Sequence, residues 1–219
     1  AGDEVPEMDL GEMRLEAVSL DPHDSHGYYE GFSNTAIWPL YHSSVVNPEF
    51  HRNHFAAYKR VNQAFADRVI SIAEVGATIW VHDYQLQLLP QLLRERRPDL
   101  VIGFFLHIPF PPSELFAQLP WRHSILQGLL GADLIGFQTH GDATNFRDST
   151  QRLLGPNIDV GRVILSDRHA EIGVFPVGID AAGFAEIAAD PAVRERAIAL
   201  RTELGDPKTL LLGVDRLDY

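Results

Sequence analysis

The sequence predicts an α/β protein built on a doubly wound, mostly parallel sheet. Short apolar runs alternate with longer amphipathic segments along most of the 219 residues. The run at residues 100–107, LVIGFFLH, is almost continuously apolar, which is typical of a strand buried on both faces of a parallel sheet. Strands that alternate with helices are joined by right-handed crossovers, so parallel pairing is expected.

The spacing of apolar residues and the positions of glycine and proline locate the elements along the chain. Pro98, for example, ends the helix before it, because proline disfavours helical geometry in the preceding residue. The expected helices cover residues 55–74, 86–97, 112–121, 124–132, 142–154 and 191–204. The expected strands cover residues 15–20, 77–81, 100–107, 133–139, 162–167, 171–179 and 209–215.

The elements divide unevenly between domains. Residues 1–180 are expected to form one sheet domain, 181–207 a helical linker, and 208–219 the first strand and loop of a second sheet. The chain begins at Ala1 without methionine and stops at Tyr219, just after a strand-like run. We therefore expect a piece of a longer protein.

Composition excludes several classes of function. The net charge of −12 argues against wholesale binding to nucleic acid or anionic membranes, although a local basic pocket for a phosphorylated ligand stays compatible with it. Cysteine is absent, so disulfides and thiolate chemistry are excluded. No apolar run is long enough to span a bilayer, and no secretory leader opens the chain, so a soluble cytoplasmic protein is expected.

Known catalytic fingerprints and metal-site patterns are missing as well. The sequence has no G-x-G-x-x-G, no G-x-x-x-x-G-K-[ST] and no G-x-S-x-G. This disfavours a classical dinucleotide oxidoreductase, a P-loop NTPase and an α/β-hydrolase. His51 and His54 lie three residues apart, but no further ligands follow at a defined spacing, so we expect no metal site.

Three strand exits carry polar residues that packing does not require: Asp83 in HDY, His107 before IPFPP, and Arg216 in DRLD. Ligands of open parallel sheets bind outside the carboxyl ends of the strands, so these residues are candidates for a site. Each has a structural alternative. Asp83 can cap the following helix, His107 can be a core histidine, and Arg216 can be a surface residue in an ion pair.

The segment YYEGFSNTAIWPLYH, residues 28–42, is dense in aromatic residues. One interpretation is a buried aromatic cluster, which is the common outcome for such runs. The other is a sugar-binding wall, in which rings stack on pyranose faces and Asn34 or His42 binds hydroxyls. The prolines of IPFPPSELF are expected to hold the loop after residue 107 in one geometry.

Taken together, these motifs resemble one family. YYEGFSNTAIWPLYH, WVHDYQLQLLPQLLR, GFFLHIPFPPSELF, LLGADLIGFQTHGDATNF, FPVGID and LLGVDRLDY occur in that order and cover nearly all of residues 28–219. The chain resembles the trehalose-6-phosphate synthases of glycosyltransferase family 20, and the residues in its motifs are similar to those of actinobacterial members. The resemblance implies a GT-B fold of two Rossmann-like domains, of which 1–180 is the first, lacking its first segment, and 208–219 begins the nucleotide-binding second.

The resemblance also implies an activity and a set of site residues. Such enzymes transfer glucose from UDP-glucose to glucose 6-phosphate with retention of configuration and without a cofactor. By motif, Tyr29 and Trp38 match acceptor-binding aromatic residues, and Asp83 matches the carboxylate that binds acceptor hydroxyls. His107 matches a histidine that contacts the donor glucose, and Arg216 an arginine on the donor diphosphate. Asp83, His107 and Arg216 are thus the implied catalytic set.

Departures from the family pattern keep alternatives open. The family's glycine-rich phosphate loop does not precede Ala1, and its diphosphate-binding lysine does not follow Tyr219. We therefore expect the isolated chain to be nearly inactive. The alternatives are another GT-B enzyme, such as a glucosylglycerol-phosphate synthase, and a non-catalytic module that binds sugar phosphate. The partners expected are small-molecule substrates; the donor nucleotide stays open among UDP, GDP and ADP. A homo-oligomer is compatible with the sequence but not required by it.

Overall fold

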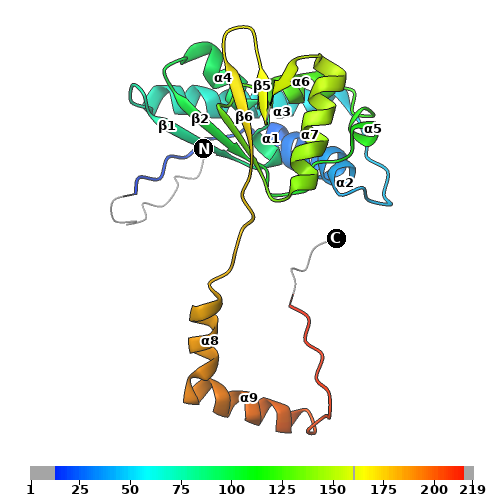
Figure 1. The fold of residues 1–219 in the computed structure, drawn as a ribbon, viewed down its shortest axis with the longest axis vertical. Helices are drawn as coiled ribbons and strands as arrows, with labels where there is room; N and C mark the ends of the chain where they lie inside the picture. Colours follow the sequence, from blue (N-terminus) through cyan, green and yellow to red (C-terminus); the bar gives the residue numbers. More distant parts are fainter. Residues whose placement is uncertain (1–12, 160, 215–219) are drawn as a thin grey trace. The chain divides into compact units, whose positions relative to one another are not determined.

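The computed structural model describes residues 13–159 and 161–214. The chain divides into two units, residues 1–176 and residues 177–219, and each is described by itself (Figure 1). Unit 1 contains the sheet and the helices packed on it, whereas the described part of unit 2 contains two helices and an extended tail. The domain assignments expected from the sequence stay a prediction.

Unit 1 is built on a six-stranded sheet of order β1-β2-β3-β6-β5-β4. The first four strands in this order are parallel, and β5 and β4 continue the sheet in antiparallel fashion. The mostly parallel α/β class is therefore confirmed. The bounds are β1 Thr78–His82, β2 Val101–Phe105, β3 Leu134–Phe137, β4 Asn157–Asp159, β5 Arg162–Ile164 and β6 His169–Val174. The three residues of β4 are too few to show strand alternation, so the sequence did not predict it.

The described residues contain helices at every segment where the sequence predicts one, and further helices over residues 22–41 that it does not predict. The helices of the described residues are α1 Pro22–His26, the π-helix η1 Gly27–Ile37, α2 Trp38–Tyr41, α3 Arg52–Ile72, the 3₁₀-helix η2 Tyr84–Leu86, α4 Leu89–Arg96, α5 Ser113–Phe116, α6 Arg122–Leu129, α7 His140–Leu154, α8 Ala181–Ala189 and α9 Pro191–Glu203. Gly155 ends α7 with φ 73°, a left-handed conformation that glycine adopts without steric cost.

The core lies between one face of the sheet and the helices. Ile102, Phe104 and Ile135 on that face are 0–2% exposed, and Figure 1 shows α3 passing behind the strands. On the opposite face Trp80 and Val101 are 67% and 52% exposed in unit 1. The expectation that residues 100–107 are buried on both faces is therefore wrong at Val101, whereas Phe105 on the same face is 7% exposed.

The aromatic run forms one continuous helical segment, α1-η1-α2, that packs against α3. Tyr28, Phe32 and Tyr41 are buried in the core, so the buried-cluster interpretation holds for these three rings. The two helices approach closely at Gly31, where a Cβ atom would lie 2.7 Å from Cγ of His54. Any larger residue at this position would force the His54 ring to shift.

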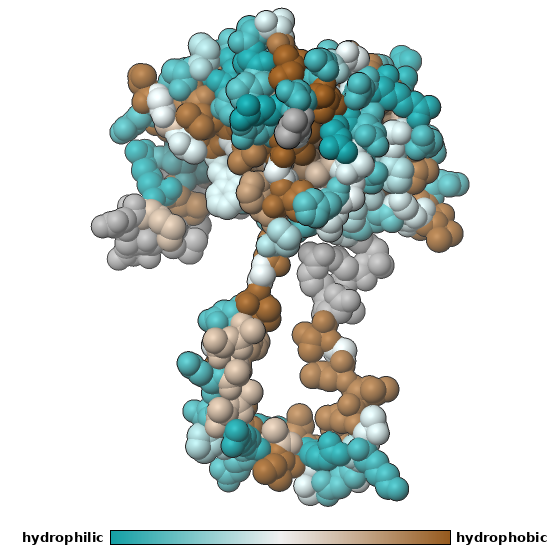
Figure 2. Space-filling view, viewed as in Figure 1, coloured by the Kyte–Doolittle hydropathy of each residue, from teal (hydrophilic) through white to brown (hydrophobic). Residues whose placement is uncertain are grey.

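Some expected elements differ from the structure. No strand forms at residues 15–20, or at 209–214, the described part of the strand expected at 209–215, because a strand needs a hydrogen-bonded neighbour and the described residues supply none. Leu211 and Leu212 are 90% and 84% exposed, and Figure 2 shows this tail largely in brown, the hydrophobic colour. The helix expected over 86–97 begins as a helix only at Leu89, since the chain first turns through η2.

The loop between β2 and α5 is held by the first turn of α7. The Phe110 N–H donates to Oδ1 of Asp142 at 2.9 Å, and Asn145 Nδ2 donates to the Phe110 carbonyl at 2.9 Å. Thr139 caps α7 by accepting from the Asp142 N–H, while its hydroxyl donates to Asp142 Oδ2 at 2.6 Å. Both backbone groups of Phe110 are thus satisfied by side chains, which fixes the path of the chain just after His107.

We predict that Asp142→Ala lowers the free energy of unfolding by about 2 kcal/mol, because it leaves a buried backbone N–H without a partner. Asp148→Ala, at an exposed position of the same helix, is the matched control and should change the stability by less than about 0.5 kcal/mol. Urea denaturation of both variants measures the difference. Equal stability of the two would show that the Asp142 carboxylate does not hold the loop.

We also predict that acid destabilises the α1-η1-α3 packing through His54. Burial lowers the pKa of His54, and the neighbouring His51 and His26 lower it further. Its Nδ1 is buried without a hydrogen-bond partner among the described residues. Because the unfolded chain binds the proton more readily, stability is full above the unfolded pKa of about 6.5 and falls as the pH drops toward the folded-state pKa.

His54→Gln removes this titration and should flatten the pH dependence of the unfolding midpoint between about pH 7.5 and pH 5. His123→Gln, at an exposed position of α6, is the control that should leave the slope unchanged. An unaltered slope in His54→Gln would contradict the prediction.

Candidate functional site

The exits of β1 and β2 meet at the carboxyl edge of the sheet. His82 pairs with Phe105 in the parallel register, so the residues that follow each strand lie side by side. The Asp83 N–H donates to the Phe105 carbonyl at 2.8 Å, and the His107 N–H donates to Oδ1 of Asp83 at 3.2 Å. The structure therefore brings together two of the residues that the sequence predicts for the site, Asp83 and His107.

Asp83 is held in a strained backbone conformation. Its φ of 72° and ψ of 173° fall in a region that is populated almost only by glycine and costs a side-chain-bearing residue roughly 1–3 kcal/mol. Oδ1 also accepts from the Tyr84 N–H at 2.9 Å, so Asp83 caps η2, and the capping interpretation is confirmed. Oδ2 accepts no hydrogen bond from the described residues. One carboxylate oxygen is thus structural, and the other is not engaged by any described residue.

A buried polar network fixes the turn that follows Asp83. The Tyr58 hydroxyl donates to the Tyr84 carbonyl at 2.7 Å and accepts from the Gln87 N–H at 3.0 Å. The Tyr41 hydroxyl donates to Gln87 Oε1 at 2.7 Å, and Asn62 Nδ2 donates to the Tyr58 carbonyl. Burial raises the pKa of Tyr58 well above its usual value, so its hydroxyl stays protonated and able to donate. The network resists relaxation of the strained residue.

His82 and His107 form a pair of imidazoles at this edge. His82 Nδ1 lies 2.8 Å from His107 Nε2, and the two rings stack with their centroids 5.2 Å apart. Burial lowers the pKa of His82, and His107 adds to this effect, while Asp83 opposes it. Both side chains are exposed, so the alternative of a core histidine is wrong for His107.

Aromatic residues of the 28–42 run line one side of the cluster. The Trp38 ring lies 5.6 Å from the Tyr84 ring and 4.0 Å from the His42 ring, centroid to centroid. The Tyr84 hydroxyl donates to Asn34 Oδ1 at 3.1 Å. Tyr29 is 46% exposed on η1 and enters none of the hydrogen bonds or ring contacts that link the other predicted residues in the described structure. Trp38 thus joins Asp83 through Tyr84, whereas Tyr29 does not.

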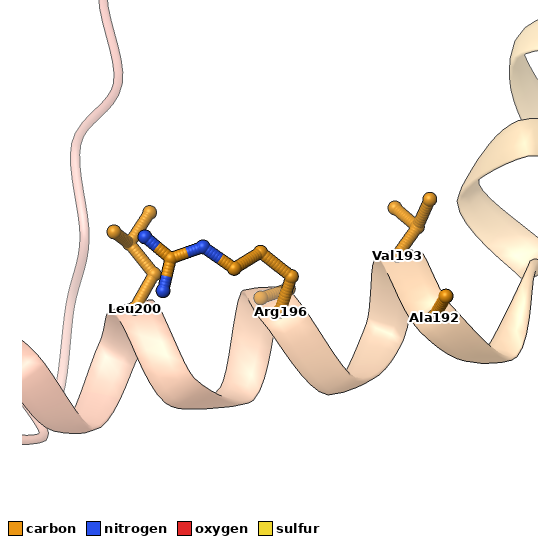
Figure 3. A pocket seen from close by; sticks show the side chains of 5 residues that line it. Ala192, Val193, Arg196 and Leu200 are labelled. Carbon is orange, nitrogen blue, oxygen red and sulfur yellow. The ribbon is translucent and has the colours of Figure 1, made fainter.

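The remaining predicted residue, Arg216, lies outside the described residues. Within residues 13–159 and 161–214, no group of three or more His, Asp or Glu side chains could hold a metal ion, and no helix is long and apolar enough to cross a membrane. An open hollow of about 460 Å³ lies on α9 in unit 2, where Arg196 extends toward Leu200 (Figure 3). None of the predicted site residues lines it.

Sequence reasoning missed two parts of the site. One is the hydrogen bond from Phe110 to Asp142 of α7. Thr139 and Asp142 have the spacing of a helix capping box, which can be recognised in the sequence, but Phe110 lies 32 residues before Asp142 and cannot be identified as its partner. The other is the contact between His82 and His107. The sequence does not predict it, because the alternation of side chains along one strand does not show which residue of the next strand lies beside His82.

Comparisons with known proteins give the family of the chain. The model of the family described as glycosyltransferase family 20 matches residues 2–219. Trehalose-6-phosphate synthase of Mycobacterium tuberculosis (strain ATCC 25618 / H37Rv) is 51% identical over 217 residues, which are 95% of this chain and 43% of that protein. A structure of the E. coli protein bound with UDP-2-fluoro glucose has a TM-score of 0.76 at 34% identity, covering 85% of this chain and 41% of that one.

The N-terminal domain of trehalose-6-phosphate phosphatase from Candida albicans is similar as well, with a TM-score of 0.76 at 33% identity over 84% of this chain and 40% of that one. The chain thus spans less than half the length of the relatives that it matches. With the family model matched along almost its whole length, this chain belongs to glycosyltransferase family 20.

Proposed function

We propose that the protein containing this chain transfers glucose from UDP-glucose to glucose 6-phosphate and releases trehalose 6-phosphate with retained configuration. The observation that carries this proposal is the junction of Asp83 and His107 at the strand exits, beside the Trp38–Tyr84 wall. Membership of family 20 and 51% identity to a trehalose-6-phosphate synthase support the reaction class. The uridine nucleotide is supported by the E. coli relative that binds UDP-2-fluoro glucose.

Each residue has a role in the proposal. Asp83 Oδ2 accepts hydrogen bonds from acceptor hydroxyls, and the rings of Tyr29 and Trp38 bound the acceptor sugar. His107 contacts the donor glucose. Arg216 stabilises the negative charge that builds on the diphosphate as the nucleotide departs, which is the point where a fixed cation lowers the barrier most.

The proposed chemistry is positional and electrostatic. The acceptor hydroxyl attacks from the side that the leaving group vacates, so configuration is retained without a protein nucleophile. Holding both sugars in register replaces an encounter in solution by a step within one complex, and this requires a rigid edge. The strained but tightly bonded Asp83 supports that requirement.

A second candidate is a non-catalytic module that binds sugar phosphate. The likeness to the N-terminal domain of a Candida albicans phosphatase supports it, because this fold also occurs in a protein named for a different reaction. Transfer activity in the full-length protein separates the two candidates. A glucosylglycerol-phosphate synthase is separated by the acceptor that is consumed, followed by mass spectrometry.

We predict that Asp83→Ala and Asp83→Gly both weaken glucose 6-phosphate binding at least about tenfold, because each removes a charged acceptor of hydrogen bonds. The two variants should differ in stability, since glycine adopts φ 72° without strain and alanine does not. Titration calorimetry of the full-length protein gives binding, and the unfolding midpoint gives stability. Retained binding with a lowered midpoint would make Asp83 only a cap.

We also predict that the 219-residue chain alone shows no measurable synthase turnover, whereas the full-length protein does. The chain corresponds to 43% of its synthase relative, and the proposal needs donor-binding groups from the remainder. A coupled assay for UDP release measures both. Turnover by the isolated chain would contradict the need for donor-binding groups beyond residue 219.

A further inference from the structure

His82 lies beside the junction of Asp83 and His107, and the proposed function gives it no role. Its Nδ1 lies 2.8 Å from Nε2 of His107, and its ring packs 4.4 Å from that of Trp80, centroid to centroid. His107 is further bounded by the Phe105 ring at 4.8 Å and by its backbone bond to Asp83. The imidazole of His107 therefore has a fixed orientation, with Nε2 turned toward His82.

A hydrogen bond between two uncharged imidazoles couples their tautomers. Each neutral ring has one N–H donor and one bare nitrogen acceptor, so one partner must donate and the other must accept. If His107 Nε2–H donates, then both rings are Nε2–H tautomers. If His82 Nδ1–H donates, then both rings are Nδ1–H tautomers. The Nε2–H form is the commoner tautomer of a free histidine side chain, so the first arrangement is favoured at both positions.

The tautomer of His107 decides what its other nitrogen can do. In the favoured arrangement His107 Nδ1 carries no proton, and it accepts no hydrogen bond from the described residues. We propose that His82 is a positioning residue, which holds His107 in the Nε2–H tautomer so that Nδ1 accepts a hydrogen bond from a sugar hydroxyl. The identity of that sugar as the donor glucose rests on the proposed function.

Protonation of either ring would remove this acceptor. A proton on His107 occupies Nδ1 directly, and a proton on His82 makes its Nδ1 a donor, which drives the His107 proton from Nε2 to Nδ1. The groups facing His82 are His107, which disfavours its charge, and Asp83, which favours it. Burial is the largest influence and lowers the pKa of His82, which disfavours the charged form of its ring.

Nitrogen NMR of the full-length protein tests the tautomer without any substrate. We expect the two ring nitrogens of His107 to show the full shift separation of a single Nε2–H tautomer. His82→Phe keeps a ring beside Trp80 but removes the hydrogen bond, and should shrink the separation. His82→Asn places an amide oxygen where Nδ1 was and should restore most of it. His123→Phe, at an exposed position of α6, is the control and should change nothing.

Kinetics test the consequence for the ligand. His82→Phe should raise the KM for the nucleotide sugar about fivefold, the effect of one hydrogen bond, and leave the KM for glucose 6-phosphate unchanged. His82→Asn should lie between His82→Phe and the unaltered protein. An Nδ1–H tautomer of His107 in the unaltered protein, or unchanged nitrogen shifts in His82→Phe, would overturn the proposal. If the protein transfers no sugar at all, the proposed function fails, and the nitrogen shifts still decide the role of His82.

Discussion

The candidate site depends on one carboxylate oxygen that ties two strand exits together. Asp83 Oδ1 accepts from the Tyr84 N–H, which starts the turn after β1, and from the His107 N–H, which lies beyond β2. Without it, the links that remain between the two loops among the described residues include the backbone bond from Asp83 to Phe105 and the contact between the imidazoles. The same link forces Asp83 into a conformation that costs energy, which the surrounding bonds offset.

Two supports lie behind this link, and they act on different loops. The Tyr41–Tyr58–Gln87 network holds the segment after β1 from the side of α3, whereas Asp142 and Asn145 hold the segment after β2 from α7. Both supports are buried and use side chains to satisfy backbone groups, so neither loop can move without leaving polar atoms unpaired. This arrangement suits a site whose proposed chemistry relies on position.

The sequence predicts the parts of this structure that depend on local pattern. The apolar runs of β1, β2 and β3 and the periodicity of α3 and α7 are read from a few neighbouring residues, and their order implies a parallel sheet. The strand expected at 15–20 does not form, and neither does the described part, 209–214, of the strand expected at 209–215, because pairing requires a partner that local pattern does not identify.

The candidate site divides in the same way. Its residues are flagged by polar types at strand exits, but the positive φ of Asp83, the imidazole pair and the hold of Asp142 on Phe110 depend on contacts between segments 20 or more residues apart. The π-helix is similar: its aromatic residues are evident, yet their i→i+5 spacing emerges only from packing against α3. A family resemblance supplies roles, and it does not supply these geometries.

In the proposed function, the residues at the exits of β1 and β2 bind sugar hydroxyls, and other residues bind the phosphate groups. The hydrogen-bonding groups of Asp83, His82 and His107 are suited to hydroxyls, and a carboxylate repels a phosphate. The phosphate groups of both proposed substrates must therefore be held by cations outside this cluster, of which Arg216 is the proposed one for the donor. The net charge of −12 is then no obstacle to binding anionic substrates. The residues that bind the sugar hydroxyls need not be the residues that bind the phosphate groups.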